Sequence, residues 1–197
     1  MPVLRLPSLP ATAGKQHWGN LPGAALSLAI AEAANSAKRF TLLLTADSQS
    51  AERLEQELSF FAPELPVLHF PDWETLPYDL FSPHQDIISQ RIAALYRLPE
   101  LKHGILVVPI TTALHRLAPT RFLLGSSLVL DVGQRINVDD MRARLEATGY
   151  RYVDTVYEHG EFTVRGALID LFPMGSKQPF RIDLFDDEIE TCLLYTS

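Results

Sequence analysis

The feature that most constrains this fold is a pair of continuous apolar runs of strand length, at residues 40–45 and 104–109. Unbroken apolar runs of this length are typical of parallel strands that are covered on both faces. A short strand at residues 67–70 and four segments with helical periodicity accompany them: 21–35, 48–61, 86–98 and 111–117. Parallel strands that alternate with helices are joined by right-handed crossovers. The N-terminal part of the chain therefore predicts a small three-layer α/β domain.

The pattern changes near residues 119–126. One helix is predicted at residues 138–148, and it ends at Gly149. Four strands then follow without helices between them, at residues 150–157, 162–172, 180–185 and 188–194. Consecutive strands joined by short turns form an antiparallel sheet, here with the helix on one face. The prediction is an α/β chain with two domains: a parallel-sheet domain at residues 1–123 and a smaller α+β domain with an antiparallel sheet at residues 124–197.

Composition narrows the environment and the partners. The 197 residues contain no apolar run near the roughly 18 residues that span a bilayer, and no signal-peptide core, so neither a membrane partner nor export is expected. The single cysteine, Cys192, excludes an internal disulfide and fits a reducing, cytoplasmic location. The net charge of −7 opposes binding to duplex DNA, because DNA-binding domains usually carry a basic surplus that neutralises phosphates.

Catalytic and metal-binding patterns are missing from the sequence. The six histidines show no metal-site spacing, and there is no Gly-x-Ser-x-Gly motif. Two acidic pairs, at residues 139–140 and 186–187, lie near a helix start and a turn, where carboxylates cap and solvate chain ends. The sequence therefore predicts no catalytic residue, no metal and no cofactor.

The loop at residues 19–26 precedes the first predicted helix, where a phosphate-binding loop would lie in a motor-type α/β domain. Such a loop needs a lysine for the β- and γ-phosphates and a hydroxyl for magnesium. In a register that starts at Gly19, those two positions hold Ala25 and Leu26. Pro22 also removes a backbone donor. We therefore expect a degenerate phosphate-binding loop and no ATP binding.

A sheet face near the C-terminus is the remaining candidate for binding. In the predicted strand at residues 180–185, apolar residues alternate with three that are able to contact a partner: Arg181, Asp183 and Phe185. If Phe172 pairs with Phe180, Arg165 lies on the same face, and a one-residue slip would reverse this. Arginines and an exposed ring are typical of binding hot spots. The alternative is a solvated face whose arginines pair with local acids.

Two blocks carry a resemblance to a known family. The first is the run of aromatics, prolines and carboxylates at residues 73–91. The second, at residues 158–188, contains Glu-His-Gly-Glu, Arg-Gly, Asp-Leu-Phe-Pro and Phe-Asp-Asp-Glu. Together they resemble the N-terminal module of bacterial transcription-repair coupling factors (Mfd), and the resemblance spans nearly the whole chain. The second block is also similar to the corresponding domain of UvrB, the damage-loading helicase of nucleotide excision repair.

The resemblance implies a division of labour. Residues 1–123 would form a degenerate RecA-like domain that has lost its nucleotide site, and residues 124–197 would form a domain that docks onto UvrA. Thr163 stands where UvrB has another arginine, and the stretch that corresponds to UvrB's tyrosine-rich damage-clamping hairpin holds one tyrosine, Tyr78. The family's UvrA-binding residues map onto four positions: Arg165, Arg181, Asp183 and Phe185.

The predicted function is therefore a non-catalytic adaptor that recruits UvrA to RNA polymerase stalled at DNA damage. RNA polymerase and duplex DNA would be contacted only through other parts of a longer parent protein, which the resemblance implies is an ATP-dependent translocase. The chain is then expected to be a fragment of that parent. The alternative is a nucleotide- or DNA-binding motor fragment of a UvrB-like helicase, which nucleotide binding or salt-dependent DNA binding would reveal.

Overall fold

In the computed structural model, the chain divides into two compact units. The structure describes residues 9, 13–76, 80–120, 123 and 130–194. The first unit contains Met1–Asp72 and Arg97–Arg116, and the second contains Trp73–Tyr96 and Leu117–Ser197. The segment Trp73–Tyr96 thus groups with the second unit, although it precedes the last strand of the first. The boundary expected between residues 123 and 124 borders positions outside the described ranges and stays a prediction.

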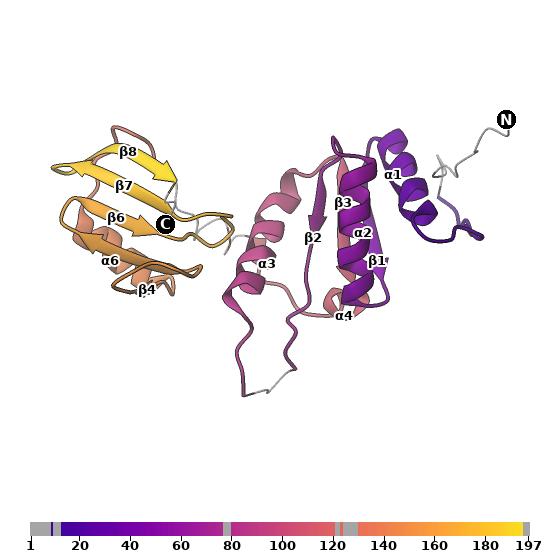
Figure 1. The fold of residues 1–197 in the computed structure, drawn as a ribbon, viewed down its shortest axis with the longest axis horizontal. Helices are drawn as coiled ribbons and strands as arrows, with labels where there is room; N and C mark the ends of the chain where they lie inside the picture. The colour runs from indigo at the N-terminus through magenta and orange to yellow at the C-terminus, as the bar shows by residue number, and fades with distance from the viewer. Residues whose placement is uncertain (1–8, 10–12, 77–79, 121–122, 124–129, 195–197) are drawn as a thin grey trace. The chain divides into compact units, whose positions relative to one another are not determined.

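The first unit is built on a three-stranded parallel sheet in the order β1-β3-β2 (Figure 1). Its strands are β1 at Phe40–Thr45, β2 at Val67–His69 and β3 at Gly104–Pro109. All six residues of the central strand β3 are buried, as its unbroken apolar sequence predicts. The predicted parallel sheet of an α/β fold is therefore confirmed.

Two helices, α1 at Ala25–Ala37 and α2 at Ser48–Phe61, pack on one face of this sheet. The side chain of Asp47 accepts a hydrogen bond from the Ser50 backbone N–H at 2.7 Å, which caps the start of α2. Two shorter helices follow, η1 at Leu98–Glu100 and α4 at Ile110–Ala113. The core between the helices and the sheet is aliphatic and includes Ile30, Ala31, Ala51, Leu54, Leu58, Ile105 and Val107.

The outer face of β1 departs from the sequence expectation. Phe40, Leu42 and Leu44 alternate along the strand and are 40%, 52% and 48% exposed. The prediction that both faces of this strand are covered is therefore wrong for β1, although it is right for β3. The physical reason is position: β1 is an edge strand, and the described residues provide no layer over its outer side chains.

The second unit contains a five-stranded sheet in the order β4-β5-β6-β7-β8 (Figure 1). The strands are β4 at Arg151–Tyr152, β5 at Glu161–Arg165, β6 at Leu168–Leu171, β7 at Phe180–Phe185 and β8 at Glu188–Leu194. Strands β5 to β8 are antiparallel, as predicted. The short strand β4 instead runs parallel to β5, because the eight residues between them return the chain to the same end of the sheet.

A helix, α6 at Val138–Ala147, covers one face of this sheet, as the sequence predicts. Asn137 begins the helix, because its side chain accepts hydrogen bonds from the backbone N–H groups of Asp139 and Asp140. Met141 and Leu145 point from α6 into a core shared with the sheet, which includes Phe162, Ile169, Leu171, Ile182, Leu184 and Ile189.

Helix α3, at Gln85–Arg97, contacts the turn between β6 and β7. The Gly175 backbone N–H donates to Ser89 Oγ at 2.8 Å, and a Cβ at Gly175 would meet Ala93 at 3.5 Å. Within the helix, Arg91 is 3% exposed, and its guanidinium lies 4.0 Å from the centre of the ring of Trp73, which precedes the helix. The conspicuous run at residues 73–91 is thus ordered in part by packing within the second unit.

Candidate binding face of the five-stranded sheet

The two faces of the five-stranded sheet differ in chemistry. The face that meets α6 is apolar and forms the core. The opposite face carries polar residues in cross-strand rows, because directly paired residues share a face. One row is Thr163, Asp170 and Arg181, and the next is Arg165, Leu168 and Asp183. The sheet therefore brings Arg165, Arg181, Asp183 and Phe185 to one side, which we call the candidate face.

The register behind this arrangement is not the one expected. Phe180 pairs with Leu171 rather than with Phe172, so the assumed pairing is wrong by one residue. The predicted strand at residues 162–172 is also two strands, since a two-residue turn at Gly166 and Ala167 divides it. Gly166 has φ +61°, a conformation that glycine adopts at little steric cost.

Arg181 is held by a buried carboxylate. Its Nε and Nη2 donate to the two oxygens of Asp170 at 2.7 and 2.8 Å, and the two residues are direct cross-strand neighbours. The Asp170 side chain is 4% exposed and that of Arg181 is 31% exposed. The pair is a bidentate ion pair, a geometry that combines strong hydrogen bonds with a fixed orientation. Arg181 is therefore paired with a local acid, as the alternative interpretation of this face expected.

Arg165 has a different environment. It is exposed, and its Nη2 donates to the backbone carbonyl oxygen of Asp154 at 2.7 Å. Within the described ranges, no carboxylate forms an ion pair with it. A carbonyl oxygen orients the guanidinium but does not neutralise its charge. Arg165 therefore keeps a positive charge at the surface of the candidate face.

Asp183 and Phe185 complete the candidate face on β7. Asp183 accepts a hydrogen bond from the Thr191 hydroxyl at 3.2 Å through Oδ2, while its Oδ1 is buried without a hydrogen-bond partner among the described residues. The Phe185 side chain is 71% exposed. An exposed ring and an exposed guanidinium on one sheet face are a combination that protein interfaces favour.

Sequence reasoning did not single out Asp170 or Glu161, which organise the polar side of the sheet. The Glu161 carboxylate accepts hydrogen bonds from the backbone N–H groups of Tyr157 and Glu158 and from Arg151, and Glu161 is 8% exposed. A signal was present for Asp170, because it stands between Ile169 and Leu171 in a strand-like run. A charge buried there requires a partner.

The loop expected to be a degenerate phosphate-binding loop has an ordinary helix start. Ala25 begins α1, and its backbone N–H donates to the Pro22 carbonyl at 3.2 Å. Leu26 packs against the core of the first unit. A Cβ at Gly19 would meet nothing within 4 Å, so no close approach of the backbone requires glycine there. The side chains at the two key positions therefore offer methyl groups where a nucleotide loop presents an amine and a hydroxyl.

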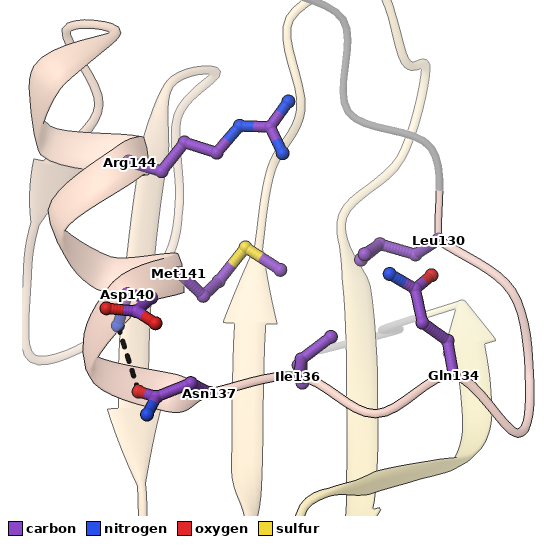
Figure 2. Close-up of a pocket in the computed structure, with 7 residues that line it drawn as sticks. All are labelled: Leu130, Gln134, Ile136, Asn137, Asp140, Met141 and Arg144. Carbon is purple, nitrogen blue, oxygen red and sulfur yellow. Dashed lines mark hydrogen bonds between the residues drawn. The ribbon is translucent and has the colours of Figure 1, made fainter.

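A small pocket lies on the α6 side of the second unit, away from the candidate face (Figure 2). Its volume is about 170 Å³, below the roughly 300 Å³ at which ligand pockets begin. Figure 2 shows the Asn137 side chain bonded to the backbone of Asp140 at the start of the helix, so this amide already serves as a cap. The pocket is lined by Leu130, Gln134, Ile136, Asn137, Asp140, Met141 and Arg144.

Among the residues that the structure describes, no three His, Cys, Asp or Glu side chains gather as a metal site requires. None of their helices is both long enough and apolar enough to cross a membrane.

Comparisons with known proteins agree with the resemblance. Residues 128–194 match the family described as the UvrB interaction domain. Over 189 residues, 95% of its length, the chain is 49% identical to the transcription-repair-coupling factor of Escherichia coli (strain K12). It is 51% identical over 173 residues to that of Haemophilus influenzae, and 28% identical over 183 residues to that of Bacillus subtilis. The first two matches cover 88–95% of this chain but only 15–16% of the curated relatives. These findings confirm the resemblance: residues 128–194 match the UvrB interaction domain, and the chain is similar over nearly its whole length to a segment of the transcription-repair-coupling factors.

Proposed function

We propose that this chain is a non-catalytic adaptor module that binds UvrA through its candidate face and so recruits UvrA to RNA polymerase stalled at DNA damage. One observation carries the proposal. Arg165 and Phe185 are exposed on the same side of the sheet, within the residues that match the UvrB interaction domain. The match supports an interaction module, and the geometry supports a particular surface of it.

The chemistry of the candidate face favours a protein partner. A ring that is 71% exposed gains free energy when an apolar pocket removes it from water, at about 25 cal/mol per Å² of apolar surface. The Arg165 fork matches the planar geometry of a carboxylate. The net charge of −7 over the whole chain disfavours phosphate backbones as the partner. We therefore assign the partner side an apolar pocket for Phe185 and an acidic group for Arg165.

The absence of catalysis is part of the proposal. Ala25 and Leu26 support it, because neither side chain provides the groups that hold triphosphate and magnesium. The contacts with RNA polymerase and duplex DNA, and ATP-driven translocation, are assigned to the rest of a longer protein. The relatives' name, transcription-repair-coupling factor, supports that assignment, and their length leaves ample room for such parts.

The test is a binding titration of this chain against purified UvrA, with matched variants. We expect Arg165→Ala and Phe185→Ala each to weaken binding by tenfold or more, since central interface residues contribute about 2 kcal/mol or more. Arg116→Ala and Phe60→Ala are the controls, because they remove an exposed arginine and an exposed ring from the first unit. Binding that is equally strong in all four variants would reject the candidate face.

A second titration separates the adaptor from the motor-fragment alternative. We expect no saturable heat when ATP and magnesium are titrated into the chain, and no retention of duplex DNA at physiological salt. Saturable nucleotide binding that Leu26→Arg abolishes would instead place a working nucleotide site at the start of α1.

A further inference from the structure

The Asp170–Arg181 pair is a buried ionic contact on the candidate face. The carboxylate is 4% exposed, and both of its oxygens accept from the same guanidinium at 2.7 and 2.8 Å. The two residues lie opposite each other on β6 and β7, in the row that begins with Thr163 on β5. The short distances and the central strands fix the carboxylate in one place.

Such a pair constrains the arginine more than it stabilises the fold. Taking a carboxylate out of water is unfavourable, and the attraction between the two charges offsets this only when the geometry is good. A bidentate contact removes most of the rotational freedom of the guanidinium. A long arginine side chain otherwise loses much conformational entropy when a partner immobilises it. An arginine that is already fixed avoids that loss on binding.

We infer that Asp170 is a positioning residue of the candidate face: it holds Arg181 in the orientation that UvrA meets. The inference rests on the proposed function and deepens it. It also divides the roles of the two arginines. Arg181 reaches the interface as part of a neutralised, preorganised pair, whereas Arg165 carries the exposed charge.

The first experiment needs no partner. Hydrogen exchange of the Arg181 Nε–H, followed by ¹⁵N NMR, reports how firmly the guanidinium is held. We expect this proton to exchange at least tenfold more slowly in the wild-type chain than in Asp170→Asn, because the charged bidentate contact is lost. The Arg165 Nε–H is the internal control and should change little. Equal exchange of the Arg181 proton in both chains would overturn the inference.

The second experiment is a double-mutant cycle measured by UvrA binding, with Asp170→Asn, Arg181→Gln and the combination. If Asp170 acts through Arg181, Asp170→Asn weakens binding about tenfold in the wild-type background and less than twofold in the Arg181→Gln background. A purely structural effect would instead lower affinity by the same factor in both backgrounds, which would contradict the inference. Circular dichroism at the working temperature verifies that each variant is folded.

A further substitution keeps charge but changes geometry. Arg181→Lys retains a cation opposite Asp170 but cannot form two parallel hydrogen bonds. We expect it to leave the thermal transition close to wild type and still to weaken UvrA binding about as much as Asp170→Asn. Wild-type affinity for this variant would show that orientation is unimportant and would reject the inference. If UvrA binds neither the wild-type chain nor any variant, the proposed function itself fails. If UvrA binds the wild-type chain but the effects of the two mutations are additive, only the inference about Asp170 fails.

Discussion

The imidazole of His159 joins helix α3 to the turn between β6 and β7: Nδ1 lies 2.8 Å from Asp86 Oδ1, and Nε2 lies 2.8 Å from the Ser176 carbonyl oxygen. Both partners are hydrogen-bond acceptors. Each ring nitrogen therefore lies within hydrogen-bond distance of an acceptor on a different segment of the chain. The ring is also stacked on Phe172, with 4.0 Å between ring centres. This contact explains how two blocks far apart in the sequence belong to one unit.

We expect His159→Gln to destabilise the second unit by about 1–2 kcal/mol, because one amide cannot replace both hydrogen bonds and the stacked ring. The free energy of unfolding in urea measures this. Amide hydrogen exchange should show faster opening of α3. His84→Gln is the matched control, since His84 contacts the same Asp86 at 3.4 Å but is largely exposed. An equally large loss of stability in His84→Gln would show that the contacts of His159 do not hold α3 to the turn.

Arg181 and Arg165 should differ in their effect on stability. Arg181→Ala leaves the Asp170 carboxylate buried without its partner, and breaking a buried pair costs about 3–5 kcal/mol. Because Arg181 is 31% exposed, we expect a smaller loss, of about 1–3 kcal/mol. Arg165→Ala removes an exposed side chain and should change stability by less than about 0.5 kcal/mol. Urea unfolding of both variants tests the contrast, and equal losses would contradict it.

The exposed charge of Arg165 predicts a salt-dependent association. If Arg165 steers encounter with an acidic surface of UvrA, Arg165→Gln lowers the association rate constant several-fold at low ionic strength. The difference should shrink above about 0.5 M salt, where the Debye length falls to a few ångströms. Stopped-flow association at several salt concentrations measures this. Phe185→Ala, by contrast, should act mainly on the dissociation rate constant at every salt concentration.

The candidate face shows how much the sequence alone could establish. Two departures from the assumed structure cancelled. The turn at Gly166 moved Arg165 to the opposite face of the sheet, and the one-residue shift in the pairing of Phe180 moved Arg181 to that same face. Arg165 and Arg181 therefore share a face, although the assumed pairing was wrong. Gly166 within a strand-like run was the available signal for the turn. The Asp170–Arg181 contact was beyond reach, because it depends on the register between two strands.

The exposure of strand side chains was also predicted wrongly from local apolar runs. The runs at residues 40–45 and 104–109 are similar in sequence, yet β3 is buried throughout and β1 is half exposed. The difference lies in the order of strands, which periodicity does not encode. Helices were easier to predict, because the apolar spacing in α2 and α6 is set within each helix. Fold class thus follows from local pattern, whereas the surface depends on topology.

The turn that divides the predicted strand gives a test of the register. Gly166 has φ +61°, and a Cβ there would meet no atom within 4 Å. Gly166→Ala should therefore destabilise the unit by about 1 kcal/mol through backbone strain alone. Gly166→Asn should cost clearly less, since asparagine tolerates this conformation better. Thermal or urea unfolding ranks the three chains. Equal stability of all three would mean that this backbone conformation is not required.

Tyr150 predicts a loss of stability at alkaline pH. Burial raises the pKa of its phenol above the usual value, although a hydrogen bond from the Met174 backbone N–H at 3.0 Å opposes this. Because the folded state has the higher pKa, its stabilisation is complete below the unfolded value near 10 and is lost as pH rises through the folded value. Wild-type stability should thus fall more steeply above about pH 10 than that of Tyr150→Phe, which has no proton to lose at this position. Tyr96→Phe is the control, because Tyr96 is 45% exposed. Urea titrations at several pH values between 7 and 11 measure this difference, because all other titrating groups contribute equally to both chains. Parallel stability curves for wild type and Tyr150→Phe would show that burial of this phenol does not govern alkaline stability.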